Sequence, residues 1–523
     1  MTSRMLIRGA AAPVLVLAFL LALAGPPLAQ TRQRPPEYNQ IVAASRIEDA
    51  AARLKEFHRL KAAYPFSVMM EDIDSFILNA RIELAPDLNA VLALQKTYVG
   101  QGVGAQRATS YLRAGSQLIQ HPKAETFDKA KVLDCVQQYS DAADKLIRDP
   151  ETTINIRDEN EKKAFAIFLS NAFLIVSAKA QLEAGNPRSA VIALDAYRAA
   201  GGALDVDYYD ILGDARYRLG DEKEAFQAYL RAAADNSKGG VEKALMLYVK
   251  LTGKEDGFID ALKAQIKKLP YEPEEFDPPV DWKGKAVLAE LFTGSECPPC
   301  VGADLAFDGL IETYPDKYLA ILEYHLPIPA PDPMMNPATR KRQAYYGIAN
   351  TPTVIIDGDN KLVGGGTRGM AGNKFLQYKA AIDPKTGEAP AVELTLAAAK
   401  SGDVVTAAFG SDIVIPGSDY LLVLVQREEE YRGSNGITYH KMIVRDLLAV
   451  EPDKAKTAEF DLAASEAAAD AYLTEFERTY TRIPNFKFGK RFHRIAREGL
   501  RVVFLAQDRT TKKILNAIIA DVQ

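Results

Sequence analysis

Two cysteines separated by two prolines stand where an apolar run gives way to a helical pattern, and this junction constrains the fold more than any other feature. The run 286–292 is apolar except for Glu290, which is typical of a central β-strand. Helical spacing begins at Cys297 and continues to about Tyr314. The Cys297-Pro298-Pro299-Cys300 segment therefore lies at the N-terminus of a predicted helix.

A dithiol in this position has the chemistry of thiol–disulfide exchange. The free N–H groups and the dipole of a helix N-terminus favour a thiolate, which is the nucleophile in that reaction. We expect Cys297 to attack and Cys300, one turn further on, to resolve the mixed disulfide. Because Pro298 and Pro299 carry no N–H, the backbone N–H of Cys300 is the main donor left for Cys297. The alternative, a zinc site, needs two further ligands, and the chain has no second CxxC motif.

The elements predicted after the dithiol follow a recognisable order. A second apolar strand covers 318–324, Thr351-Pro352-Thr353 leads into strands 353–356 and 361–363, and a closing helix covers 373–382. This order, over about 280–385, resembles the thioredoxin-like superfamily. The resemblance implies that Pro352 is the cis proline that packs against the dithiol and helps to bind the backbone of a substrate.

Shorter motifs are similar to those of exported bacterial members of this superfamily. They are Leu291-Phe292-Thr293 before the dithiol, Tyr324-His325, and the Asp332-Pro333 pair in a proline-rich segment. That segment is expected to form a loop beside the dithiol or a surface excursion, and both alternatives stay open. For His325 the alternatives are assistance near the dithiol and a hydrogen-bonded structural role.

Two carboxylates qualify the resemblance. Glu296 occupies the position before the first cysteine, where the superfamily often has Trp, and its charge disfavours a thiolate at Cys297. A strong oxidant is therefore not expected. Glu290 is one residue out of register with the buried acid that relays protons in many thioredoxins, so we expect either proton relay or a structurally paired carboxylate.

The segment 40–269 has a helical pattern with an internal repeat. The turn 182–186 and the turn 218–221 each precede a helix, with a period of 34–35 residues that predicts a solenoid of helix pairs. The second copy resembles the tetratricopeptide repeat at Tyr209, Leu212, Gly213, Ala225, Tyr229 and Ala232. We expect a repeat domain that offers a surface to a protein partner. Cys135 follows helical spacing on an apolar face and is expected to be a small buried hydrophobe.

A proline-rich acidic linker, 271–280, separates the helices from the dithiol region, and the pattern changes again after 386. Short strand-like runs separated by turns predict an all-β, sandwich-like domain over 389–523, with a helical insertion at 464–480. The predicted fold class is therefore multidomain: an all-α repeat domain, an α/β thioredoxin-like domain and a C-terminal β-domain.

The N-terminus has the pattern of an export signal. Arg4 and Arg8 precede an apolar run, 10–24, that is short for a membrane span and ends at Gly25. We expect a signal peptide over 1–29, cleaved after Ala24 or Ala29, and no stable membrane span afterwards. The product would be periplasmic or secreted, in a compartment that permits disulfides.

These observations predict an exported thiol–disulfide oxidoreductase that acts on protein thiol or disulfide clients together with a redox partner protein. No cofactor or metal is expected. The net charge of −5 without a long basic tract makes nucleic acid an unexpected partner. The competing hypothesis is a non-enzymatic interaction protein in which Cys297 and Cys300 form a structural disulfide. The sequence does not indicate the net direction of exchange.

Overall fold

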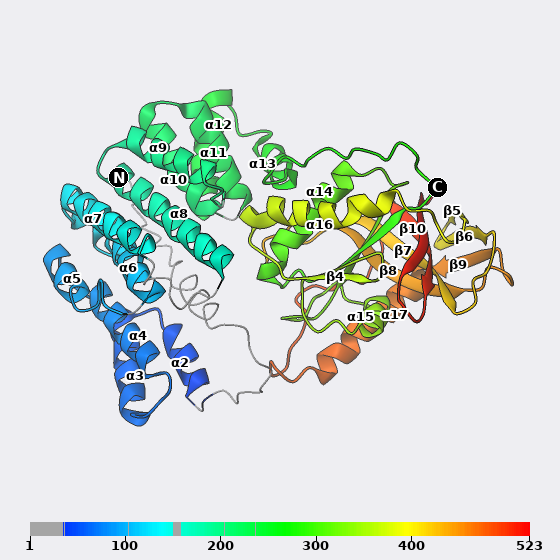
Figure 1. Ribbon diagram of the computed structural model, residues 1–523, viewed down its shortest axis with the longest axis horizontal. Helices are drawn as coiled ribbons and strands as arrows, with labels where there is room; N and C mark the ends of the chain where they lie inside the picture. Colours follow the sequence, from blue (N-terminus) through cyan, green and yellow to red (C-terminus); the bar gives the residue numbers. More distant parts are fainter. Residues whose placement is uncertain (1–34, 36, 103, 150–157, 203, 236) are drawn as a thin grey trace. The chain divides into compact units, whose positions relative to one another are not determined.

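The computed structural model describes residues 35, 37–102, 104–149, 158–202, 204–235 and 237–523 (Figure 1). The chain forms two compact units, 1–200 and 201–523. The described part of the first unit is helical, and the second combines helices with strands, which confirms the predicted multidomain organisation at this level. The predicted signal segment 1–29 lies outside the described residues.

The first unit is built from successive helices whose starts are fixed by side-chain caps. Asp49, Asp87 and Asp128 each accept a hydrogen bond from the backbone N–H three residues on, which satisfies a donor that the helix itself leaves free. The helices are α2 (Tyr38–Ser45), α3 (Ala50–Ala63), α4 (Met70–Glu83), α5 (Leu88–Gln95), α6 (Ala105–Gln120), η1 (Ala124–Thr126), α7 (Lys129–Ile147), α8 (Glu159–Glu183) and α9 (Pro187–Ala199).

Helix α8 is apolar over much of its length. Among the described residues, its stretch Glu161–Glu183 is the one helix long and apolar enough to cross a membrane. Leu169 and Phe173 of this helix are nevertheless buried in a cluster with Ala108 and Ala143, from α6 and α7. The apolar character of α8 is therefore used, at least in part, for packing within the unit.

The second unit begins with four helices: α10 (Val206–Leu219), α11 (Glu222–Ala234), α12 (Lys238–Thr252) and α13 (Phe258–Lys267). Helices α10 and α11 approach closely because Gly213 has no side chain, and a Cβ there would lie 2.5 Å from the ring of Tyr229. The Tyr229 hydroxyl donates to Asp214 at 2.7 Å. The sequence predicted one helical domain over 40–269, whereas these four helices belong to the same compact unit as the sheet.

One large sheet dominates the second unit, with strand order β11-β10-β7-β8-β2-β1-β3-β4 (Figure 1). Strand β2 pairs in parallel with β1 on one side and with β8 on the other, and all the other pairs in this sheet are antiparallel. The strands are β1 (Val287–Thr293), β2 (Leu319–His325), β3 (Thr353–Ile356), β4 (Asn360–Val363), β7 (Ser418–Glu430), β8 (Tyr439–Val450), β10 (Leu500–Asp508) and β11 (Ile514–Asp521).

The remaining elements cover this sheet. Helices α14 (Val301–Thr313) and α16 (Ala371–Thr386) pack side by side and both contact β1 (Figure 1). A second sheet, in the order β5-β6-β9, packs against β10 and β11. The other elements are η3 (Pro298–Cys300), α15 (Pro337–Tyr346), η4 (Arg368–Met370), β5 (Leu394–Ser401), β6 (Val404–Ser411), β9 (Thr457–Asp461) and α17 (Leu462–Thr479).

The expected separation into a dithiol domain and a β-domain from residue 389 is not what the structure has. Strand β8 joins the two parts, because it pairs with β2 at Glu323 and Ile443 and with β7 along its length. Strands β7 and β10 are buried on both faces: Val423 and Val503 belong to the core that contains β1, and neighbours such as Leu424 pack on the second sheet. Strands that shield both cores cannot form a domain independent of either.

Candidate functional site

The two cysteines lie where β1 ends and α14 begins. A four-residue loop, 294–297, leads from Thr293 into η3, and α14 follows directly after Cys300. Cys297 and Cys300 form a disulfide with their Cα atoms 5.3 Å apart. The sheet thus presents the disulfide at the end of a fully buried strand, at the start of a helix that packs on the same sheet.

The backbone N–H of Cys300 does not serve the sulfur of Cys297. It donates to the carbonyl oxygen of Cys297 at 2.9 Å, as the closing bond of the η3 turn. The sulfur of Cys297 instead has a hydrogen-bond contact with Thr351, whose Oγ1 lies 3.4 Å from Cys297 Sγ. The same hydroxyl donates to the carbonyl oxygen of Ile328 at 2.7 Å.

Both cysteines are completely buried, with an exposed fraction of 0% for each. The loop 364–366 closes one side: the N–H of Gly366 donates to the Pro299 carbonyl oxygen at 2.8 Å. At Gly365 a Cβ would lie 1.7 Å from that oxygen and 2.9 Å from the ring of Pro352. The sequence Gly364-Gly365-Gly366-Thr367 therefore permits a close approach of two backbones beside the disulfide.

Pro352 lies against this loop. The peptide bond between Thr351 and Pro352 is cis, and the carbonyl oxygen of Pro352 accepts a hydrogen bond from the N–H of Gly364 at 3.3 Å. Of the residues singled out from the sequence, Cys297, Cys300 and Pro352 are thus brought together around one turn. The Thr351 hydroxyl, which sequence patterns did not single out, belongs to the same group.

A second covering segment comes from the loop between β7 and β8, residues 431–438, which we call the β7–β8 loop. Gly433 lies so close to Ser295 that a Cβ would be 2.2 Å from the Ser295 carbonyl oxygen. The N–H of Asn435 donates to the same oxygen at 3.1 Å, and its side chain donates to the Gly294 carbonyl oxygen at 3.3 Å. This loop fixes the segment that enters the dithiol turn.

The β7–β8 loop also holds the carboxylate of Glu296. The Tyr431 hydroxyl donates to it at 2.8 Å, and the backbone N–H of Ser434 donates at 3.3 Å. Burial and the Glu296 charge raise the pKa of Tyr431, so the phenol keeps its proton and remains a donor. These donors disperse the charge that made Glu296 unfavourable next to a thiolate.

The proline-rich segment between β2 and α15 lies beside the dithiol and is not a surface excursion. Asp332 is completely buried and accepts from the Ser295 hydroxyl at 2.9 Å, from the Met334 N–H at 2.8 Å and from His325 Nδ1 at 3.1 Å. Burial raises the pKa of Asp332, but the charge and hydrogen bond of His325 together with the N–H donors hold it below its usual range. His325 is therefore tied into a structural hydrogen-bond network.

Glu290 has structural partners, which favours the second of the two predicted roles. Its carboxylate receives two hydrogen bonds from Arg342, at 2.6 and 2.9 Å, and one each from the hydroxyls of Tyr346 and Tyr324 at 2.7 and 3.0 Å. Glu290 and Arg342 are both buried. The bidentate guanidinium and the two phenols occupy both carboxylate oxygens, so the geometry favours a structurally paired carboxylate over a proton relay.

Two buried acids that sequence patterns missed lie on α14 and on β2. Asp304 accepts a hydrogen bond from Thr293 Oγ1 at 2.5 Å, and Glu323 on β2 has an oxygen without a hydrogen-bond partner. Burial raises the pKa of each well above its usual range, and the neighbouring carboxyl groups raise it further. The sequence feature that could have identified both residues is an acidic residue within an otherwise apolar strand or helix face.

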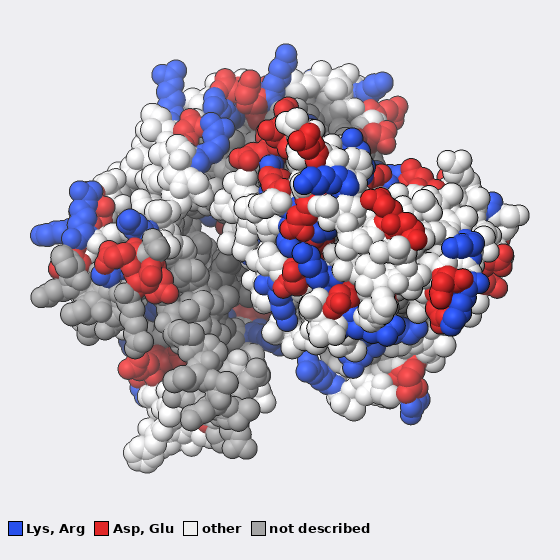
Figure 2. All heavy atoms as spheres, turned by 45° about the vertical axis from the view of Figure 1, so that its right-hand side comes forward, with Lys and Arg blue, Asp and Glu red and all other residues white. Residues whose placement is uncertain are grey.

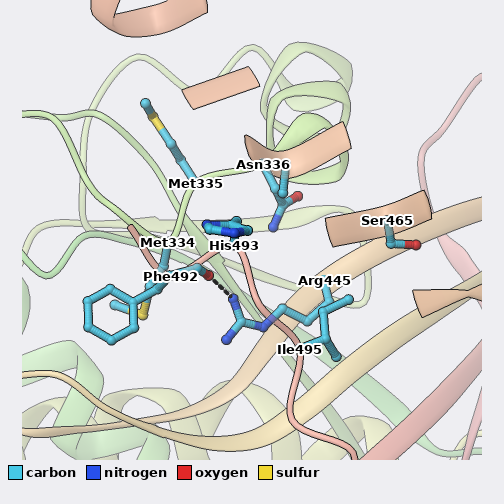
Figure 3. A pocket seen from close by; sticks show the side chains of 9 residues that line it. Met334, Met335, Asn336, Arg445, Ser465, Phe492, His493 and Ile495 are labelled. Carbon is cyan, nitrogen blue, oxygen red and sulfur yellow. Dashed lines mark hydrogen bonds between the residues drawn. The ribbon is translucent and has the colours of Figure 1, made fainter. Parts of the chain in front are cut away.

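Three further features of the described residues give no ligand site: Cys135, the acidic and histidine side chains taken together, and the hollow lined by Arg445 and Phe492. Cys135 is half-buried beside Val132 and Val136, and burial raises the pKa of its thiol. Among the described residues no group of three or more His, Cys, Asp or Glu side chains is placed to hold a metal ion. The hollow in Figure 3 is filled: Arg445 Nη1 donates to the Phe492 carbonyl oxygen at 2.7 Å, and the free volume is close to 0 Å³.

Searches against protein-family models, curated proteins and solved structures find no match to this chain.

Proposed function

We propose that this chain is an exported thiol–disulfide oxidoreductase that exchanges disulfides with protein clients through Cys297 and Cys300. The observation that carries the proposal is the disulfide itself, at the junction of a buried central strand and a helix, with Thr351 and Pro352 beside it. The thioredoxin-like identity of 280–385 and the tetratricopeptide-like identity of the preceding helices belong to the same proposal. The sandwich-like character of the C-terminal strands is also part of this proposal.

The proposed reaction needs only the dithiol and a client. In the reducing direction, the Cys297 thiolate attacks one sulfur of a client disulfide; a mixed disulfide forms and the other client sulfur leaves as a thiolate. Cys300, after losing its proton, attacks the Cys297 sulfur and releases the second client thiolate. The client disulfide is reduced, the two cysteines are oxidised, and both client thiolates take up protons. The opposite direction reverses each step.

The environment of Cys297 supports a nucleophile of moderate acidity. The start of α14 and the Thr351 hydroxyl favour the thiolate, whereas Glu296 disfavours it. Because Tyr431 and Ser434 donate to Glu296, part of that repulsion is offset. The proposal therefore remains one of exchange without a strongly oxidising dithiol.

Protein clients and a redox partner protein are proposed as partners, with the helical repeats as a further docking surface. On the face shown in Figure 2, basic and acidic side chains are intermixed over the described residues, which supports partners other than nucleic acid. Export rests on the sequence of residues 1–29 alone. No cofactor is required by the proposed reaction.

One observation favours the second candidate, an interaction protein with a structural disulfide. Cys297 and Cys300 have no exposed surface, so a client sulfur cannot reach Cys297 unless the covering loops move. A disulfide that is both buried and hard to reduce would be structural.

Trapping separates the two functions. A Cys300→Ser variant in a Cys135→Ser background leaves Cys297 as the lone thiol, and the oxidoreductase is expected to accumulate mixed disulfides through it. Cys297→Ser in the same background is the matched control. Absence of adducts, with a wild-type disulfide whose reduction potential lies below about −300 mV, the range of structural bonds, would leave only the scaffold function.

A further inference from the structure

A small basic cavity lies between α13, α14, η4 and the start of β8. Its free volume is about 20 Å³, and its lining includes three cations, Lys267, Arg368 and Lys441. A cavity needs roughly 10–15 Å³ of such volume to hold one water molecule. The space therefore accepts about one oxygen-sized atom of a ligand.

Two hydrogen-bonding groups of this lining are buried and unused. Arg368 has an exposed side-chain fraction of 12%, and its Nη1 has no hydrogen-bond partner. Thr438 Oγ1 is likewise buried without a partner. Because unpaired buried donors are costly, such groups indicate a ligand atom or ion that completes them.

Positive charge exceeds negative charge around the cavity. Lys441 pairs with Asp308 at 3.3 Å, Lys267 pairs with Glu428 at 2.8 Å, and Arg368 pairs with Asp235 at 2.8 Å. Two more guanidinium groups act on Asp235. One is Arg231, which is 6% exposed and has two unpartnered nitrogens, and the other is Arg432 of the β7–β8 loop. The lining itself holds three cations, Lys267, Arg368 and Lys441, and one carboxylate, Asp308.

The cavity is connected to the disulfide through the two segments that cover it. Arg368 follows the loop 364–366, whose Gly366 binds Pro299. Thr438 ends the β7–β8 loop, whose earlier residues bind Ser295 and Glu296. A ligand bound here would contact both covering segments at once.

We propose that this cavity binds a carboxylate group, with Arg368 and Thr438 as hydrogen-bond donors and Lys267 and Lys441 as charge partners. A carboxylate can place one oxygen in this volume, and its charge matches the excess of cations in the lining. The carboxylate can come from solution or from an acidic side chain of a protein client. The client source rests on the proposed function.

The direct test titrates the full chain with sodium acetate, sodium phosphate and sodium chloride at constant ionic strength, read by calorimetry and by Tm. Acetate is expected to bind and to raise Tm above the chloride value, since a ligand of the native state stabilises it. Lys267→Met should weaken acetate binding by about ten-fold, the scale of one charge-assisted contact. Lys254→Met, which changes an exposed lysine in the connection before α13, should leave acetate binding unchanged.

Equal effects of acetate and chloride, or unchanged affinity in Lys267→Met, would overturn the site. Phosphate binding as tight as acetate binding would overturn the assignment to a carboxylate.

The source of the carboxylate is tested by measuring the rate of disulfide exchange with two peptides, which differ only in having Glu or Gln next to the cysteine. Faster exchange with the Glu peptide, lost in Lys267→Met, assigns the site to clients, and equal rates assign it to a free carboxylate. No exchange with either peptide, with acetate still bound, refutes the proposed function and leaves the site intact.

Discussion

Thr351 Oγ1 lies 3.4 Å from Cys297 Sγ and 2.7 Å from the carbonyl oxygen of Ile328. A hydroxyl has a single proton, so in the disulfide form it is given to the shorter contact with Ile328. After reduction, a thiolate at Cys297 competes for it as a charged acceptor. Thr351 is thus the side chain placed to respond to the redox state of the dithiol.

Thr351→Val is expected to raise the pKa of the reduced Cys297 thiol by about one unit, because the thiolate loses a hydrogen-bond donor. The measurement is the pH dependence of alkylation of Cys297 by iodoacetamide in a Cys135→Ser background. Thr353→Val is the matched control, since the Thr353 hydroxyl donates to Asn350 at 2.8 Å. An alkylation profile identical to that of the wild type would show that the hydroxyl does not act on the sulfur.

Gly433→Ala is expected to speed the reduction of the Cys297–Cys300 disulfide by dithiothreitol. An added Cβ would lie 2.2 Å from the Ser295 carbonyl oxygen, so the β7–β8 loop must move away from the segment that it covers. Gly489→Ala is the control, because nothing lies within 4 Å of a Cβ at that position. Equal reduction rates in the three proteins would mean that this loop does not limit access.

Arg342→Met is expected to lower the free energy of unfolding by about 3–5 kcal/mol, because it leaves the buried Glu290 carboxylate without its guanidinium. Urea unfolding measures the effect. Removing an exposed pair member, as in Arg478→Met, should change stability by at most about 0.5 kcal/mol. If Arg342→Met lowered the free energy of unfolding no more than Arg478→Met does, the structural role assigned to the Glu290–Arg342 pair would be contradicted.

His440→Gln is expected to make the protein less sensitive to acid. Burial, with a contribution from His325, lowers the pKa of His440 to about 3, whereas an unfolded histidine titrates near 6.5. Unfolding therefore takes up a proton between these values, and native stability falls with decreasing pH by up to about 1.4 kcal/mol per unit for this group. The measurement is the free energy of unfolding at pH 7, 6 and 5.

The variant should lose less stability than the wild type over this range, because glutamine does not titrate while its amide can still donate to the Tyr431 carbonyl oxygen that His440 binds at 2.9 Å. His58→Gln, an exposed position, should keep the wild-type slope. Parallel slopes in all three proteins would contradict a buried neutral His440.

Local patterns identified much of the fold. The apolar run before Cys297 is β1, the helical spacing after it is α14, and the predicted strands 353–356 and 361–363 are β3 and β4. Strand β8 was missed because Lys441, Arg445 and Asp446 interrupt its apolar pattern. In the structure the Lys441–Asp308 pair and the bonds of Arg445 to Gln426 and Phe492 satisfy those charges, which a one-dimensional pattern cannot represent.

By itself the sequence determined the dithiol and its place between a strand and a helix, since each depends on residues close together in the chain. Pro352 is distant in the chain, and its place beside the dithiol was expected only from the family resemblance. Tertiary structure decided what surrounds them. Glu290 meets Arg342 across 52 residues, and Glu296 meets Tyr431 across 135. The contact of Glu296 with Tyr431 follows from the pairing of β2 with β8, which brings the β7–β8 loop onto the disulfide. The contact of Glu290 with Arg342 depends on α15, which packs on β8. Long-range strand pairing, not local propensity, therefore determined the burial and the electrostatics of the site.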